Sequence, residues 1–288
     1  MGGAFQPFAP ASATRRTHAR SGAITRYTIL RDNFTIGTWI ALGSLLQGLI
    51  FVVLPARYAL LPVVALLSHR ILRTLLMQFG LIHNAQMDGV YPGKFTAQIP
   101  GRNGEPPHRS SGQDITIMIL AARSNHPLGM LGPGYRDVAD HFNGMLNHLW
   151  KGGENYGFLG SSSWLSANER HAGNQIMVVT YFRSQEELHA FAHGPLHSKA
   201  WNWWNSIAKT HPYLSIMHEV YTMPKGHWEN IFVNNHLTGI AATNARVEID
   251  GEHLRPLFDA TRGSLRSQLG RLGRGTGTEN GEYGEDVY

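Results

Sequence analysis

The sequence contains no cysteine among its 288 residues. This absence excludes a disulfide scaffold, a cysteine nucleophile, and zinc or iron–sulfur sites that depend on thiolate ligands. The chain also lacks the glycine-rich phosphate loop, the dinucleotide fingerprint, the nucleophile elbow and the HExxH helix. No pattern in the sequence therefore indicates ATP, nicotinamide or flavin chemistry.

Acidic residues are almost absent from the first 80 positions, where Asp32 stands alone beside eight arginines. Residues 81–240 carry equal numbers of acidic and basic side chains. The excess positive charge therefore lies beside the most apolar part of the chain, which is typical of membrane orientation. The middle of the chain has no basic stripe with interleaved aromatic residues, so we expect no nucleic-acid partner.

Residues 36–54 form a run of 19 amino acids without a charge. With a rise of about 1.5 Å per residue, this run predicts a helix about 28 Å long, close to the thickness of the hydrocarbon core. A second apolar run over residues 58–68 is too short to span a bilayer alone, and Arg70 and Arg73 follow it. We expect residues 36–80 to be a membrane-associated helical segment. The second run is either the return of a hairpin or, as slightly favoured, an interfacial helix; a buried core helix at 36–54 is the alternative to membrane insertion.

Residues 1–35 are predicted to be a flexible basic tail. The apolar run that follows begins too late for an ordinary secretory signal. The membrane expected for the chain is that of the endoplasmic reticulum. Residues 11–31 are rich in Arg, Ser and Thr and contain no acid, which a mitochondrial transit peptide would also show. A mitochondrial membrane is therefore the alternative.

The soluble part shows four strand-like runs with helical patterns after the first and the third. The runs are residues 115–122, 157–165, 176–182 and 214–223. This βαββαβ order is that of the ferredoxin-like α+β fold, an antiparallel sheet with two helices on one face. The strands are apolar at nearly every position, so both faces of the sheet should be buried. Either a second subunit covers the open face, which would make a homodimer with a two-chain barrel, or residues 86–99 and 226–240 cover it.

These patterns divide the chain into four parts. After the tail and the membrane segment, residues 86–241 form the predicted domain. Residues 242–288 form a C-terminal extension. Its glycine-rich end predicts disorder from about residue 263.

Histidine is abundant, with 16 residues in the chain. His189, His193 and His197 stand four apart, a spacing that metal binding would use. Gly194 and Pro195 interrupt the helix, however, and no acidic ligand is near. We therefore favour capping and surface roles for these residues over a metal site.

His218 and Glu219 lie side by side within the otherwise apolar fourth strand. Neighbouring strand residues face opposite sides of a sheet, so these two cannot form an acid–base pair with each other. A buried imidazole or carboxylate needs a partner or a shifted pKa, which makes this position a candidate site. A structural pair of Glu219 with Arg183 or Arg123 is the alternative.

Aromatic residues gather near the second predicted helix and the third strand, and they are either core or the lining of a substrate pocket. They are Tyr181, Phe182, Trp201, Trp203 and Trp204. Arg123 and Asn125 end the first strand, where they either hold an anion or a carbonyl oxygen or cap a turn.

Four segments together resemble the fungal af470-like monooxygenase family, which is related to the antibiotic-biosynthesis monooxygenases of the dimeric α/β-barrel superfamily. The segments are RSNHPLG (123–129), YGFLGSSSWL (156–165), YFRSQEELHAFAHGPLHSKAWNWW (181–204) and HEVYTMPKGHWENIFVNNHLTGIA (218–241). The resemblance covers about residues 86–241, and members often carry an N-terminal hydrophobic segment. Leu237 departs from the proline expected before Thr-Gly.

The resemblance implies a monooxygenase that acts on a lipophilic polyketide or terpenoid intermediate in fungal secondary metabolism. Related enzymes work without flavin or metal: an activated substrate is deprotonated and passes an electron to O₂, while the protein supplies a base and a dry pocket. Under this resemblance His218 or His197 is the base, and Arg123 and Asn125 stabilise the developing oxygen charge. The pocket residues it implies are Trp201, Tyr181, Glu219 and Tyr221.

Two other functions remain open at this level. A haem-dependent α/β-barrel enzyme would use one axial histidine, for which His197 and His218 are candidates. A non-catalytic, membrane-tethered protein that binds an intermediate of the same pathway is the other.

Overall fold

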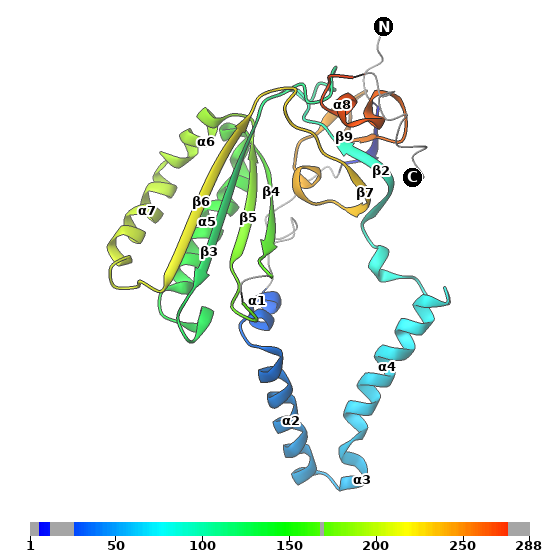
Figure 1. Cartoon of the computed structure of the whole chain (residues 1–288), viewed down its shortest axis with the longest axis vertical. Coiled ribbons are helices and arrows are strands. Elements are labelled where there is room, and N and C mark those ends of the chain that lie inside the picture. Colours follow the sequence, from blue (N-terminus) through cyan, green and yellow to red (C-terminus); the bar gives the residue numbers. More distant parts are fainter. Residues whose placement is uncertain (1–5, 12–25, 168–169, 276–288) are drawn as a thin grey trace.

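The computed structural model describes residues 6–11, 26–167 and 170–275. This part of the chain forms two antiparallel sheets, three helices on the outer face of one sheet, and a pair of long helices that extends from one end (Figure 1). Residues 1–5 and 12–25 of the predicted tail and the last positions, 276–288, lie outside the described residues.

The central sheet confirms the predicted βαββαβ order. Its strands pair in the order β4-β5-β3-β6, and every pairing is antiparallel. They are β3 (Ile115–Ser124), β4 (Phe158–Leu165), β5 (Ile176–Phe182) and β6 (Leu214–Met223). The connecting helices are α5 (Tyr135–Gly152), α6 (Gln185–Ala192) and α7 (Pro195–Ile207). The fold of this unit is therefore ferredoxin-like.

Local sequence explains why the second connection contains two helices. The Ser184 side chain caps α6 by accepting the Glu187 backbone N–H at 3.2 Å. Gly194 then ends the segment, and Pro195 occupies the first turn of α7, where the missing N–H costs nothing.

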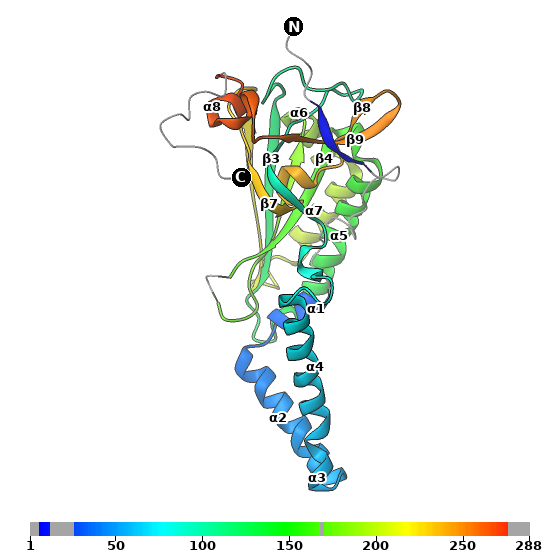
Figure 2. The same ribbon diagram turned by 90° about the vertical axis from the view of Figure 1, so that its right-hand side faces the viewer.

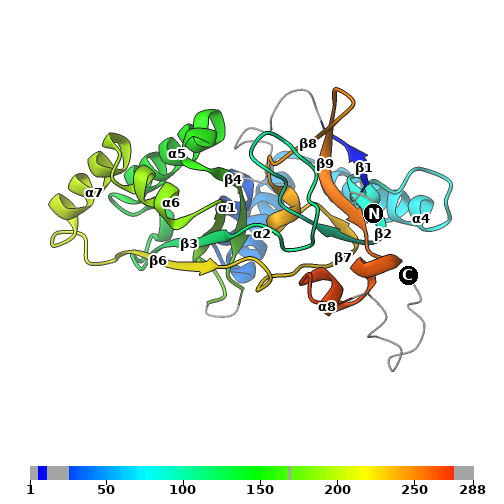
Figure 3. The same ribbon diagram turned by 90° about the horizontal axis from the view of Figure 1, so that it is seen from above.

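The helices cover one face of the central sheet, as Figure 3 shows from above. Leu146, Leu149 and Trp150 of α5 meet Val178 and Phe182 of β5 in a buried cluster. Leu188 and Phe191 of α6 complete the same cluster. This contact buries the apolar stripe of α5 that the sequence predicts.

A second sheet lies on the opposite side of the central sheet. It has the order β1-β9-β2-β7, with β8 paired to β9. Its strands are β1 (Pro7–Pro10), β2 (Val90–Ala97), β7 (Phe232–His236), β8 (Val247–Ile249) and β9 (Glu252–Asp259). Phe95, Trp228 and Leu257 pack in one core with Ile115 and Tyr181 of the central sheet. Residues 86–99 and 226–240 therefore cover part of the open face, as one alternative predicted, with unpredicted help from β1 and β9.

Two predictions about the chain ends are wrong for the described residues. The tail is not free at Pro7–Pro10, because β1 pairs with β9. The C-terminal extension does not become disordered at residue 263, because η6 (Gly263–Arg266) and α8 (Gln268–Arg271) fold onto the second sheet. The cause is a buried polar network that the glycine-rich composition does not reveal.

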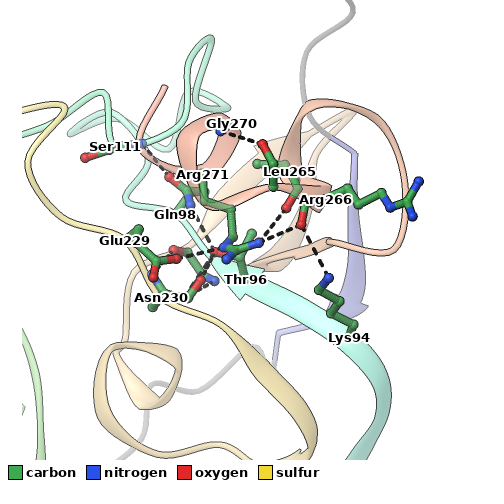
Figure 4. A network of polar contacts seen from close by, with 12 residues as sticks. Lys94, Thr96, Gln98, Ser111, Glu229, Asn230, Leu265, Arg266, Gly270 and Arg271 are labelled. Carbon is green, nitrogen blue, oxygen red and sulfur yellow. Dashed lines mark hydrogen bonds and ion pairs between the residues drawn. The ribbon is translucent and has the colours of Figure 1, made fainter. Parts of the chain in front are cut away.

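The buried guanidinium of Arg271 organises this network (Figure 4). Its Nε lies 2.7 Å from Glu229 Oε2, and its Nη1 donates to the carbonyl oxygens of Leu265 and Arg266 at 3.1 and 2.8 Å. The neighbouring Asn230 donates to and accepts from the backbone of Ala97, at 2.7 Å in both cases. The C-terminal segment is thereby attached to β2.

The apolar N-terminal region forms a helical hairpin that extends from one end of the two sheets (Figures 1 and 2). Its elements are α1 (Arg26–Asp32), α2 (Ile36–Val53), α3 (Ala56–Ala59) and α4 (Leu61–Gln78). None of the residues of α2 and α4, both fully described, is buried. The core-helix alternative for residues 36–54 is therefore wrong.

The second arm of the hairpin is longer than the apolar run that predicted it. The helix continues past Ser68 because leucine and arginine are good helix formers. Two spans, Ile36–Val53 and Ala56–Gln78, are long and apolar enough to cross a membrane by length and composition. The helix of the second arm, α4, is therefore long enough for the return of a hairpin, and the slightly favoured interfacial helix stays a prediction.

Candidate active site

The predicted site residues on β6 divide between the two faces of the central sheet. His218 lies opposite Leu120 of β3, on the face that carries the helices. Glu219 lies opposite Ile119, on the face toward the second sheet. The strand alternation read from the sequence is therefore correct, and the predicted set does not form one cluster.

His197 lies on α7 and is partly buried on the helix-covered side. Its ring packs edge-on against Phe191, with ring centroids 6.1 Å apart. Burial lowers the pKa of His197, and the charges of His218 and His193 lower it further. A hydrogen bond to the Ala192 carbonyl acts in the opposite direction. The structure therefore brings His197 and His218 into electrostatic contact.

This arrangement equips His197 to accept a proton. A lowered pKa keeps the ring neutral near pH 7, which is the protonation state of a general base. His218 on the facing strand is exposed.

The opposite face of the sheet carries the two predicted tyrosines. Tyr181 is only 9% exposed within the core between the sheets, and burial raises its pKa to about 12. Tyr221 donates to Glu219 Oε2 at 2.7 Å, which raises the pKa of Tyr221. Glu219 thus pairs with Tyr221 on an exposed surface, and Arg183 donates instead to the Pro100 carbonyl at 2.9 Å.

Trp201 and Tyr181 do not form two walls of one pocket. Trp201 is 49% exposed on α7, on the helix-covered side, whereas Tyr181 belongs to the core on the other side. Trp203 instead packs against His141 of α5, with ring centroids 4.5 Å apart. The aromatic group of the sequence is thus divided by the sheet.

Arg123 and Asn125 lie beyond the helix-covered site as well. Arg123 pairs with Ser215 and shares the Glu219 face of the sheet. Asn125 is exposed in the following turn, where its backbone N–H donates to the Tyr213 carbonyl at 2.7 Å. The two residues are not brought to His197, so the structure gives no contact through which they could stabilise charge there.

The metal-like histidine spacing leads to no cluster in the part of the chain that is described. The rings of His189 and His193 lie 6.3 Å apart. No group of three His, Asp or Glu side chains that could hold a metal occurs among the described residues.

The strand β6 is an open edge of the central sheet, and a single chain does not bury it on both faces as the sequence predicts for all four strands. Its side chains from Ser215 to Thr222 are all exposed. They include Ile216, Met217, Val220 and Tyr221 at 39%, 36%, 38% and 52%. His218 is therefore not enclosed within a single chain.

The sequence did not predict a hollow at the base of the hairpin. A hollow of about 450 Å³ lies between the start of α2 and the loops after β3 and β4. Asp32, beside it, binds the β4–β5 loop through Asn174 at 2.7 and 3.0 Å. The signal available in the sequence was that Asp32 is the single acid in the first 80 residues.

The chain matches a family model over its central part and a relative over nearly its full length. Residues 115–240 match the family model described as "Monooxygenase af470-like". Over 279 residues the chain is 31% identical to "Monooxygenase af470" of Aspergillus fumigatus (strain ATCC MYA-4609 / CBS 101355 / FGSC A1100 / Af293). That alignment covers 95% of this chain and 99% of the relative.

Solved structures with a similar arrangement are more distant. SnoaB, a cofactor-independent oxygenase from Streptomyces nogalater, is 9% identical with a TM-score of 0.27, over 39% of this chain and 94% of its own. A dimeric protein of unknown function and ferredoxin-like fold from Bacteroides fragilis NCTC 9343 is 13% identical with a TM-score of 0.27, over 38% and 96%. An aldoxime dehydratase is 14% identical with a TM-score of 0.35, over 49% and 42%.

Proposed function

The chain belongs to the af470-like monooxygenase family, and from this premise we propose that it is a membrane-anchored monooxygenase for a lipophilic small molecule. The substrate class proposed is a polyketide or terpenoid intermediate of fungal secondary metabolism. The reaction proposed uses O₂ without flavin or metal. The observation that carries the chemistry is the partly buried imidazole of His197, which packs against Phe191 with ring centroids 6.1 Å apart and whose pKa is lowered by that burial.

His197 is the proposed general base. It takes a proton from an activated carbon of the substrate, and the resulting carbanion reduces O₂. For an activated methylene, CH₂ and O₂ give C=O and H₂O. The substrate thus supplies all the electrons, and no external reductant is consumed. The residues of α7 and β6 then need only bind the substrate, hold the proton acceptor and exclude water.

A second copy of the chain is the proposed partner that closes the site. His218 and its apolar neighbours on β6 are exposed in one chain, and an open edge strand presents unpaired backbone groups for association. Pairing there would bury this strand and dry the space beside His197. We therefore propose a homodimer as the working enzyme.

The hairpin supports anchoring in a membrane, with both of its ends on one side. Before the hairpin, β1 pairs with β9; after it, β2 pairs with the same strand. Both flanks thus belong to one folded body, and only the α3 end can reach the opposite surface. Arginines before α2 favour the cytosolic side for the body, on a membrane of the endoplasmic reticulum.

Deleting the gene in the native host and restoring it as variants tests this function. The wild type and His189→Gln, an exposed control on α6, should return the oxidised metabolite. His197→Gln should leave the unoxidised precursor. If His197→Gln restores the product fully, the base assignment is wrong, and a binding role in the pathway becomes the better account. Haem in the purified active protein, seen as a Soret band, would overturn the cofactor-free chemistry.

A further inference from the structure

The hollow at the base of the hairpin lies where α2 leaves the folded body. Its walls come from three segments that are distant in sequence: the start of α2, the β3–α5 loop and the β4–β5 loop. Asn33, Thr35 and Thr38 line it from the first segment, and Arg170 and His171 from the third. Its volume is about 450 Å³.

Hydrogen bonds fix these walls in place. The Asn33 side chain accepts the Met130 N–H at 2.9 Å, and the Asp32 carbonyl accepts the Gly173 N–H at 2.6 Å. Gly129 has a φ of +58°, and a Cβ there would lie 2.3 Å from Asn33 Oδ1. Only glycine therefore allows the β3–α5 loop to approach α2 so closely. These contacts hold the described walls of the hollow against one another.

The lining favours an anion. Arg170 supplies a cation, His171 adds a ring N–H that can donate a hydrogen bond, and the hydroxyls of Thr35 and Thr38 add polar groups. One Arg170 N–H donates to the Ser124 carbonyl at 3.2 Å, which orients the guanidinium while other N–H groups remain on it. Among the described residues that line the hollow, none is acidic. The nearby Asp32 carboxylate is engaged by Asn174.

The position of the hollow distinguishes a lipid from other anions. It opens at the first turn of α2, and Trp39, the residue after Thr38, donates to the Arg31 carbonyl at 3.0 Å. Leu128 and Leu131, in the loop that forms one wall, are 58% and 64% exposed. Exposed leucines and a tryptophan beside cations are typical of a surface at the level of lipid headgroups.

We propose that this hollow binds the phosphate headgroup of an anionic phospholipid and seats the folded body on the membrane. The proposal rests on the membrane anchoring proposed above, and it adds a lipid class and a binding site. Arg170 and His171 contact the phosphate, and the threonine hydroxyls complete the contact.

Lipid retention by the purified full chain tests the site. The delipidated protein in detergent is mixed with equal amounts of phosphatidylglycerol and phosphatidylcholine, and bound lipids are counted by native mass spectrometry. The wild type should retain phosphatidylglycerol preferentially. Arg170→Gln combined with His171→Gln should reduce that preference by about fivefold or more. The matched control is Arg262→Gln, since Arg262 is 85% exposed and pairs with Asp259 in the turn after β9.

Three results would overturn the site. One is equal retention of both lipids by the wild type; another is an equal loss in the control. The third concerns hydrogen exchange in the β4–β5 loop. If inorganic phosphate slows this exchange to the same extent as phosphatidylglycerol, the hollow binds a free anion rather than a lipid.

Flotation with vesicles of phosphatidylcholine alone tests membrane anchoring independently of the headgroup site. If all variants float equally but no lipid preference exists, the headgroup site fails and the anchoring stands. If the wild type does not float on any vesicle, the anchoring fails and the headgroup site fails with it.

Discussion

The surroundings of His197 set its charge. Burial lowers its pKa because the imidazolium loses solvation, and the neighbouring His218 and His193 act in the same direction through like charge. A hydrogen bond to the Ala192 carbonyl opposes them by raising the pKa. The proposed site therefore has a single base, His197, rather than a pair of catalytic residues.

The pH dependence of turnover follows from this environment. His197 is neutral, and can act as a base, only above its pKa. Because that pKa is lowered from 6.5, the ordinary value for histidine, kcat/KM should rise with pH with a midpoint below 6.5. His218→Gln removes a positive neighbour, which makes protonation of His197 easier and raises its pKa. The rising part of the kcat/KM profile should therefore move to higher pH. If the rising part of the kcat/KM profile stays at the same pH or moves to lower pH in His218→Gln, the charge of His218 does not act on His197.

A variant of Tyr181 is the control for the variant of His197. Its phenol is buried on the far side of the sheet from His197, and its raised pKa of about 12 keeps it neutral. Tyr181→Phe removes one oxygen and should leave turnover within about twofold, whereas His197→Gln should reduce turnover by about 10²-fold or more. Equal losses in both variants, measured as kcat with purified protein, would move the site to the other face.

The elements show which parts of the fold a single sequence can predict. The four strands of the central sheet and the capped start of α6 depend on runs of apolar residues and on Ser184, which are local signals. The second sheet has no such signal, because β1 and β9 pair across more than 240 positions. The alternation of side chains along a strand was also enough to predict that His218 and Glu219 face opposite sides of the sheet. Only the register of β3 against β5 and β6 could show that Tyr181 and Arg123 lie away from His197.

The C-terminal element depends on one buried cation. Arg271 is 6% exposed and links Glu229 to two carbonyl groups, so Arg271→Ala leaves a carboxylate and two acceptors without their partner. We expect a loss of about 2–4 kcal/mol in the free energy of unfolding. The exposed pair of Arg262 with Asp259 is the control, and Arg262→Ala should cost less than about 1 kcal/mol. Denaturant unfolding of the two variants measures both, and similar values would contradict a structural role for Arg271.

At the scale of the whole molecule, the two sheets form one body from which the hairpin extends (Figure 1). Since β1 and β2 both pair with β9, the residues before and after the hairpin must lie on the same side of any membrane it enters. The sequence alone could not give this result, because arginines flank the apolar region on both sides and the second apolar run slightly favoured an interfacial helix over the return of a hairpin.

Single cysteines can test this arrangement, because the chain has none of its own. In sealed microsomes, Gln6→Cys and Lys151→Cys should react together with a membrane-impermeant maleimide added from the cytosolic side. If one of the two reacts only after the membrane is opened, the hairpin is a single span and the shared body is wrong.

The most direct test of the central claim is oxygen labelling with the purified full chain. The protein, reconstituted in vesicles, is incubated under ¹⁸O₂ with the precursor that accumulates in the deletion strain. The account predicts a product that carries one ¹⁸O atom, formed without added flavin, metal or reductant, and lost in His197→Gln but not in His189→Gln. A product without label, or equal labelling by His197→Gln, would contradict it.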